Sequence, residues 1–213
     1  MVALTILPIP VGELQTNCYL VYNRPDQAVL IDPGDEAGRI LEVLRENRAE
    51  IQAILLTHAH FDHMMAAEAV KKAYNAPLMV YEGEREALTD GMVNLSVPMT
   101  GRGCRVEAER FLRDGEDVAV GDMTFHVRHT PGHTAGSCCY ELCGTDALFT
   151  GDTLFWNSYG RTDFPGGSGR EIIASVRGLL ALPGDRAVYP GHGPSTTLEE
   201  ERRANPLAGG GRP

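Results

Sequence analysis

The six residues HAHFDH at positions 58–63 bring together four side chains that can bind a metal ion. They directly follow residues 51–56, a continuous apolar run that predicts a strand buried on both faces. Because alternate side chains of an extended chain point to the same side, the first two histidines can converge on one point, while Asp62 and His63 face a neighbouring point. Neutral imidazole and carboxylate are suitable ligands for a cation such as Zn²⁺. The alternative interpretation is a polar loop in which Asp62 caps the next helix.

Three further donors stand in glycine-flanked turns downstream. His133 follows a Pro-Gly turn, whereas Asp152 and His192 each follow the end of a predicted strand. Glycine lets the backbone approach a ligand closely or adopt a positive φ, so each turn can direct one donor rigidly at a common centre. With the segment at 58–63, these turns supply seven donors, which suffices for two cations.

The pattern of apolar residues predicts alternating strands and helices, without an internal repeat. Strands are predicted at 4–9, 18–22, 28–31, 51–56, 118–120, 123–128, 137–142, 146–150 and 187–189. Helices are predicted at 36–48, 63–74, 82–88, 170–181 and 198–203, and a loop at 91–103. This order is compatible with two sheets packed face to face with helices outside, although periodicity alone does not select that arrangement over other α/β folds.

Composition excludes several classes of protein. A chain of 213 residues can bury a large core without disulfides, and the odd count of five cysteines predicts reduced, structural thiols. The net charge of −10 argues against nucleic acid and anionic lipid as partners, because both require clustered Lys and Arg. No apolar stretch approaches the ~20 residues that span a bilayer, and the N-terminus lacks the basic region of a signal peptide. We therefore expect one cytoplasmic domain over 1–213; the sequence does not indicate its oligomeric state.

The donor pattern resembles the metal-ligand set of the metallo-β-lactamase superfamily in order and spacing along nearly the whole chain. The segments THAHFDH, HTPGHTAGS, LFTGDTLF, GRTDFPGG and YPGHGPSTTLEEE are similar to those of small glyoxalase II-like hydrolases, also called hydroxyacylglutathione hydrolase-like proteins. This resemblance implies an α/β fold, a four-layer αββα sandwich with two metals at one edge of its two sheets.

The resemblance also implies a role for each donor. It assigns the first metal to His58, His60 and His133, the second to Asp62, His63 and His192, and the bridging position to Asp152. Asp62 and Asp152 are then the catalytic carboxylates, acting with a metal-bound hydroxide on a thioester such as S-lactoylglutathione. Zn²⁺ is the first expectation for both ions, with Fe and Mn as alternatives that the same ligands accept. Relatives that degrade β-lactams usually carry Cys at the position of Asp152, so the Asp favours a different hydrolase.

Several polar residues outside the donor set are candidates for supporting roles. Arg161 and Tyr159 are expected to rim a substrate pocket; the alternative for Arg161 is a pair with Asp163 that fixes the loop. His129 is predicted to orient a ligating imidazole, and Asp32 to support the metal-binding loop, because ligating histidines are usually held by a further group.

Two departures leave the substrate open. Larger glyoxalase II enzymes continue into a helical extension that grips glutathione, whereas this chain ends soon after residues 198–203. Affinity for glutathione must then come from elsewhere, or the substrate is a different thioester or ester. The alternative activity is that of persulfide dioxygenases, which share a GRTDF-type segment. Their resemblance implies a single iron held by the residues matching His58, His133 and Asp152.

Overall fold

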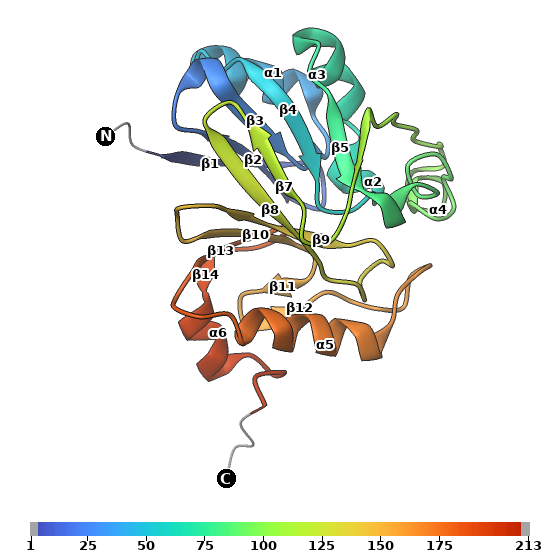
Figure 1. Ribbon diagram of the computed structural model, residues 1–213. Helices are drawn as coiled ribbons and strands as arrows, with labels where there is room; N and C mark the ends of the chain where they lie inside the picture. Colours follow the sequence, from blue (N-terminus) through green and yellow to red (C-terminus); the bar gives the residue numbers. More distant parts are fainter. Residues whose placement is uncertain (1–3, 210–213) are drawn as a thin grey trace.

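The computed structural model describes residues 4–209, which form two six-stranded sheets packed face to face (Figure 1). In spatial order, the first sheet contains β1 (Thr5–Val11), β2 (Thr16–Tyr22), β3 (Ala28–Ile31), β4 (Ile51–Leu56), β5 (Leu78–Tyr81) and β6 (Arg110–Leu112). The second contains β14 (Thr196–Thr197), β13 (Ala187–Pro190), β10 (Ala147–Gly151), β9 (Cys138–Leu142), β8 (Met123–His129) and β7 (Asp117–Val120). A small hairpin pairs β11 (Leu154–Phe155) with β12 (Ser158–Tyr159).

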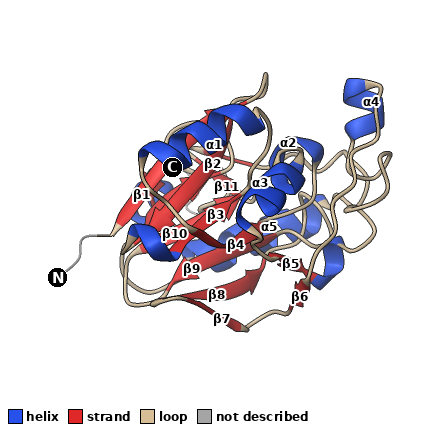
Figure 2. Cartoon of the chain, turned by 90° about the horizontal axis from the view of Figure 1, so that it is seen from above, coloured by secondary structure: helices blue, strands red, loops and turns tan. Residues whose placement is uncertain are grey.

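Helices cover the outer face of each sheet. Figure 2 shows α1 (Ala37–Glu46) and α3 (Ala67–Tyr74) over the first sheet, and Figure 1 shows α5 (Gly169–Leu180) and α6 (Leu198–Ala204) on the far side of the second. The connections contain the short helices α2 (Phe61–Met64) and α4 (Ser96–Thr100) and the 3-10 turns η1 (Pro25–Gln27) and η2 (Glu82–Glu84). The predicted four-layer αββα sandwich is therefore confirmed.

Strand β4 shows how one apolar run serves two cores. Ile54 and Leu56 pack into the core beneath α1 and α3, whereas Ala53 and Leu55 pack into the core between the two sheets. Successive side chains of a strand point to opposite faces, so a strand covered on both faces is apolar at nearly every position. The prediction of a doubly buried strand at 51–56 is confirmed, and this strand leads directly into His58.

The sheet topology brings the donor-bearing segments to one edge. Strands β3, β4, β5 and β6 run parallel to one another, and β10 runs parallel to β13. Parallel neighbours end at the same side of a sheet, so Asp152 after β10 and His192 after β13 lie next to each other. The two packed sheets therefore place the loops after β4, β10 and β13 at a shared, rigid edge.

The segment after β4 differs from its prediction. One helix was expected at 63–74, but α2 ends at Met64 and α3 begins at Ala67. The amide of Ala66 donates to the carbonyl of Pro33, at 3.0 Å, instead of to the preceding turn of its own helix. The loop after β3 thus interrupts the helix, an effect that no local pattern encodes.

The region between β5 and β6 also departs from expectation. The helix predicted at 82–88 is limited to the 3-10 turn η2, and the loop predicted at 91–103 contains α4. The strands β5, β6, β11, β12 and β14, of two to four residues each, were not predicted.

The five cysteines are free, as predicted, but Cys143 is exposed and is not part of the core. Within residues 4–209, no helix has the length and apolar character that a bilayer crossing requires. Residues 1–3 and 210–213 of the predicted single domain lie outside the described part of the chain, and the domain limits stay a prediction.

Candidate metal centre

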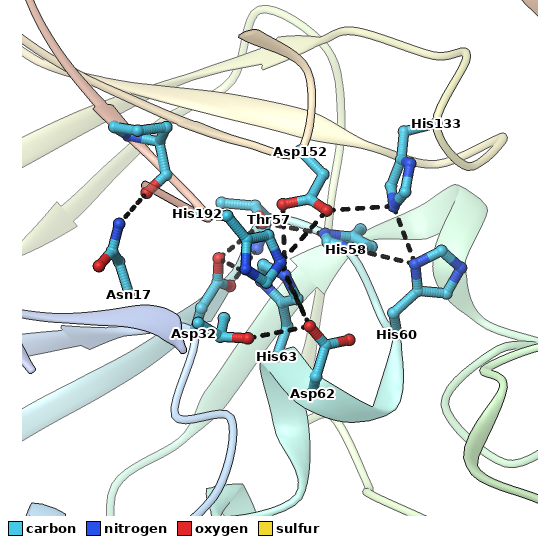
Figure 3. Close-up of polar contacts among 12 residues, drawn as sticks. Asn17, Asp32, Thr57, His58, His60, Asp62, His63, His133, Asp152 and His192 are labelled. Carbon is cyan, nitrogen blue, oxygen red and sulfur yellow. Dashed lines mark hydrogen bonds and ion pairs between the residues drawn. The ribbon is translucent and has the colours of Figure 1, made fainter. Parts of the chain in front are cut away.

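The seven predicted donors converge at the shared edge of the two sheets (Figure 3). In the first group, which we define as His58, His60 and His133, three ring nitrogens meet. Nδ1 of His60 lies 3.1 Å from Nε2 of His58 and 2.9 Å from Nε2 of His133. All three side chains are buried.

The second group, defined as Asp62, His63 and His192, lies directly beside the first. Oδ2 of Asp62 is 3.6 Å from Nε2 of His63 and 3.3 Å from Nε2 of His192. Its position is fixed by the hydroxyl of Thr16, which donates to Oδ2 at 2.9 Å. Thr16 was not predicted, because a threonine at the start of a strand carries no sequence signal for such a contact.

Asp152 lies between the two groups and contacts both. Its Oδ1 is 3.3 Å from Nε2 of His63, and its Oδ2 is 3.4 Å from Nε2 of His133 and 3.6 Å from Nε2 of His192. The backbone of Gly191 passes so close that a Cβ there would lie 2.2 Å from Oδ1 of Asp152. Glycine is thus required at this position for Asp152 to occupy the central place.

Two of the imidazoles are oriented by backbone carbonyls. Nδ1 of His133 donates to the carbonyl of Arg161 at 2.8 Å, and Nδ1 of His192 donates to the carbonyl of Leu14 at 3.1 Å. A carbonyl only accepts, so in each ring Nδ1 carries the proton and Nε2 keeps its lone pair directed at the centre. Neither carbonyl could be inferred from residue type.

Asp32 orients two more imidazoles. Its carboxylate accepts from the amide and the hydroxyl of Thr57, both at 2.7 Å, and its Oδ2 lies 3.0 Å from Nδ1 of His63. Because the Thr57 hydroxyl gives its hydrogen to Asp32, its oxygen accepts from Nδ1 of His58, at 3.2 Å. The structure therefore places Asp32 behind both His58 and His63, where the sequence predicted a supporting residue.

The donor set fits divalent cations. Nδ1 of His60 lies within 3.1 Å of Nε2 of both His58 and His133, and the ligand atoms of the three residues lie within 4.8 Å of one another, a spacing that suits a shared cation. Nε2 of His63 and Oδ1 of Asp152 are buried and make no hydrogen bond. Buried polar atoms are nearly always satisfied, so unpaired nitrogen and oxygen atoms in this position indicate cation ligands. Imidazole and carboxylate together suit Zn²⁺, Fe²⁺ and Mn²⁺.

Four of these groups titrate in the direction that favours a bound cation. In contrast, the carboxylates outweigh burial and raise the pKa of His63 and of His192, so a cation there would have to displace a proton. Burial, with the neighbouring histidines, lowers the pKa of His58 well below its usual range and that of His60 to about 3, so both rings are neutral. Burial raises the pKa of Asp62, but the charge of His63 and the hydrogen bond of His192 outweigh that effect and lower it to about 2. Burial also raises the pKa of Asp152, but the neighbouring histidines, His63 foremost, outweigh that effect and lower it. The carboxylates therefore stay ionised.

A cavity of about 410 Å³ opens onto the donors. Apart from the donors, its lining is mainly apolar and aromatic: Leu14, Phe61, Leu95, Met99, Phe155, Ser158, Tyr159, Arg161 and Phe164. A second cavity of about 340 Å³, lined in part by Gly12, Asp35 and Met65, shares Phe61, Asp62 and Met99 with the first. The two cavities are therefore neighbours, and Asp62 borders both.

The candidate substrate residues lie at the larger cavity, which we call the cleft. Tyr159 and Arg161 both line it. The guanidinium of Arg161 also forms two hydrogen bonds with the carboxylate of Asp163, at 2.7 and 2.6 Å, and lies 4.0 Å above the ring of Phe164. Arg161 therefore lies at the pocket and also pairs with Asp163, so the structure contains both of the alternatives considered for it.

His129 does not occupy the predicted position. Its ring stacks on Tyr81, with centroids 4.3 Å apart, and its Nε2 pairs with the carbonyl of Ala135 at 2.9 Å. It makes no hydrogen bond to a donor residue within the described chain, so the prediction that it orients an imidazole is wrong. Residues four apart share a face in a helix or a continuous strand, but β8 ends at His129 and the chain turns before His133.

We expect Asp32→Asn to weaken metal binding by about 10- to 100-fold. The amide NH₂ of asparagine would face a hydrogen-bond donor of Thr57 or His63, so the rings of His58 and His63 would lose their orientation. Zinc affinity, measured by competition with a chromophoric chelator, checks this. The matched control is Asp117→Asn, which alters an Asp–His pair on the surface, where Oδ1 of Asp117 is 2.7 Å from Nδ1 of His126. Wild-type zinc affinity in Asp32→Asn would contradict the orienting role.

Comparison with known proteins finds relatives over nearly the whole chain. An uncharacterized protein of Mycobacterium leprae is 42% identical over an alignment 222 residues long. The alignment covers 96% of this chain and 99% of that protein. The hydroxyacylglutathione hydrolase GloC of Haemophilus influenzae is 34% identical over 209 residues, which cover 93% of this chain and 95% of that protein.

Solved structures share the fold and the sequence. The crystal structure of BLEG-1 B3 metallo-beta-lactamase matches with a TM-score of 0.92 and 40% identity, covering 97% of this chain and 100% of that one. The crystal structure of TTHA1623 in a di-iron-bound form matches with a TM-score of 0.84 and 36% identity, covering 94% and 99%. The family model of the metallo-beta-lactamase superfamily matches residues 11–192, a span that contains all seven donors. The protein belongs to the metallo-β-lactamase superfamily.

Proposed function

We propose that the protein is a metal-dependent hydrolase that cleaves thioesters of the S-lactoylglutathione type. The observation that carries this proposal is the convergence of seven donors, in two adjacent groups joined by Asp152, at the floor of an apolar cleft. The similarity to a relative named hydroxyacylglutathione hydrolase supports the substrate class.

In this proposal each group would hold one divalent cation, and the carboxylate of Asp152, which contacts both groups, would be shared between them. We propose Zn²⁺ for both, with iron and manganese as alternatives; the similarity to a structure in a di-iron-bound form supports iron as a possible occupant. When bound, such ions polarise a carbonyl group and lower the pKa of coordinated water, so that hydroxide is available near neutral pH. The overall reaction adds water to the carbonyl carbon, breaks the C–S bond, and yields a carboxylic acid and a thiol.

The residues of the chain then bind and orient the substrate. Asp62 borders two neighbouring cavities, which suits a substrate whose acyl and thiol parts extend in different directions from the scissile bond. Phe61, Tyr159 and Phe164 supply apolar surface that removes water from these parts. Asp62 and Asp152 stay ionised at the cleft, so they hold positive charge where negative charge develops on the substrate oxygen.

β-Lactam hydrolysis is a second candidate function. It is favoured by the 40% identity to a structure described as a B3 metallo-beta-lactamase. An aspartate at the position of Asp152 and the glyoxalase II-like segments favour thioesters instead. The persulfide dioxygenase alternative requires only one iron, on His58, His133 and Asp152. The retained Asp62, His63 and His192 are compatible with either activity, so the number of bound ions decides between them.

A substrate panel on the zinc-loaded and iron-loaded protein separates these functions. We expect thiol release from S-lactoylglutathione, and from a lactoyl thioester of a small neutral thiol, without oxygen uptake. Faster turnover of a chromogenic cephalosporin than of either thioester would favour the β-lactamase. Oxygen consumption with glutathione persulfide by a form holding one iron per chain would favour the dioxygenase.

Asp152→Ala should abolish thioester hydrolysis and reduce metal content together, since the two groups lose the carboxylate that contacts both. We expect a loss of more than about 100-fold in kcat/KM, beyond the effect of removing an orienting residue. Thiol release and metal analysis on the same sample check this. Asp122→Ala, on the surface beside Asn23, is the control. Activity that survives intact in Asp152→Ala would remove the bridging role.

Tyr159→Ala should raise KM for the thioester by about 3- to 10-fold with kcat changed less than twofold, because an apolar wall contributes to binding in the ground state and the transition state alike. Steady-state kinetics of thiol release check this. Trp156→Ala is the control: Trp156 is 49% exposed, its Nε1 donates to Glu200, and it is outside the lining of the cleft. An unchanged KM in Tyr159→Ala would place substrate elsewhere.

A further inference from the structure

Glu84 is a buried carboxylate that the proposed mechanism does not use. It lies in the turn η2, directly after β5, and only 2% of its surface is exposed. Its Oε2 accepts from the amide of Ala59 at 2.8 Å. Its Oε1 accepts from the hydroxyl of Thr134, at 2.5 Å, and from the amide of Gly136, at 3.0 Å.

Burial raises the pKa of Glu84, and its three hydrogen-bond partners oppose that effect by favouring the ionised form. Both amides can only donate, and the Thr134 hydroxyl also donates to it, so all three contacts end on acceptor oxygens. Among the ion pairs within residues 4–209, none involves Glu84, so it is held by hydrogen bonds alone. A charge buried in this way is costly unless its hydrogen bonds compensate, and such a group is seldom kept without a role.

The three contacts join the two chain segments that carry the first group. Ala59 lies between His58 and His60, and Thr134 and Gly136 directly follow His133. One carboxylate therefore ties the loop after β4 to the loop after β8, across 75 residues of sequence between Ala59 and Thr134. The second group is held by other contacts, from Thr16, Asp32 and Leu14.

A close backbone approach reinforces this connection. A Cβ on Gly136 would lie 2.5 Å from the carbonyl carbon of Gly83 and 2.7 Å from Oε1 of Glu84. The loop after β8 can therefore reach Glu84 only because residue 136 is glycine. The contact depends on backbone position as well as on the side chain.

The first group contains no carboxylate of its own, and Glu84 places a carboxylate close to it. His58, His60 and His133 are three imidazoles, and among the seven donors only Asp152 adds a carboxylate to them. A cation held mainly by neutral ligands in a buried site is stabilised by a nearby negative charge, because screening by water is weak there. Glu84 accepts from the amide of Ala59, which lies between His58 and His60, so its charge lies close to two of the ligands.

We propose that Glu84 is a positioning residue that sets the affinity of the first group for its metal ion and leaves the second group unaffected. This inference rests on the two-cation centre of the proposed function, not on the identity of the substrate. The competing possibility is that Glu84 only stabilises the fold. Glu201 represents that possibility: it is 0% exposed and accepts from Asn157, Thr196 and Asn205, away from the donors.

The test places Glu84→Gln in two backgrounds that each retain one group. His192→Ala disables the second group, and His60→Ala disables the first. Glutamine keeps the shape of Glu84 but removes its charge. Its NH₂ group then faces one of the hydrogen-bond donors that the carboxylate accepts from. We measure zinc dissociation constants by chelator competition and the unfolding temperature of the zinc-loaded and zinc-depleted proteins.

We expect Glu84→Gln to weaken zinc binding by about 10- to 100-fold in the His192→Ala background and by less than about twofold in the His60→Ala background. The control Glu201→Gln should lower the unfolding temperature of both forms equally and leave both zinc constants unchanged. Equal weakening in the two backgrounds, or none in either, would overturn the proposal.

A second variant covers the case in which Glu84→Gln does not fold. Thr134→Val removes one of the three hydrogen bonds while keeping the side-chain shape, and we expect it to weaken zinc binding at the first group by at least about threefold. An unchanged constant for that variant would likewise overturn the proposal. The parent protein provides a separate check: fewer than two zinc ions per chain in the wild type would refute the two-cation centre itself, independently of Glu84.

Discussion

The centre depends on where the imidazole protons are held. An imidazole can bind a cation only through a nitrogen that has a lone pair, and that nitrogen is chosen by the hydrogen bond at the other one. Here Asp32 accepts from His63 directly and from His58 through Thr57, so both rings direct Nε2 inward. Backbone carbonyls do the same for the remaining rings that use Nε2. His60 is the exception: its Nδ1 faces the first group, and its buried Nε2 has no hydrogen-bond partner within the described residues.

This requirement explains why the donors lie at the edge of two packed sheets. The acceptors behind the imidazoles come from the loops after β1, β3 and β12, which are far apart in sequence. Only a rigid framework can hold such loops to the accuracy that a metal site needs. The cores on both faces of β4, and the parallel pairing of β10 with β13, supply that framework.

The charges of the protein favour cation binding at the centre but do not favour anion binding in the cleft. Asp62 and Asp152 are ionised and buried, and the whole chain carries a net charge of −10, so the protein attracts cations and gives no long-range attraction to an anionic substrate. The one basic residue of the larger cavity, Arg161, is already paired with Asp163. In the proposed function, substrate binding would therefore depend on apolar contact in the cleft and on the metal ions.

The sequence by itself determined the chemistry of the donors and the class of fold. HxHxDH after a doubly buried strand, with His133, Asp152 and His192 in glycine-flanked turns, identified the family, because residue type and local spacing are properties of the chain. Tertiary structure alone decided what surrounds those donors. Backbone carbonyls such as those of Leu14 and Arg161 have no side-chain signature, and Glu84 meets Thr134 only after two distant loops pack. His129 has the right residue type but the wrong direction, since direction depends on how the chain turns after β8.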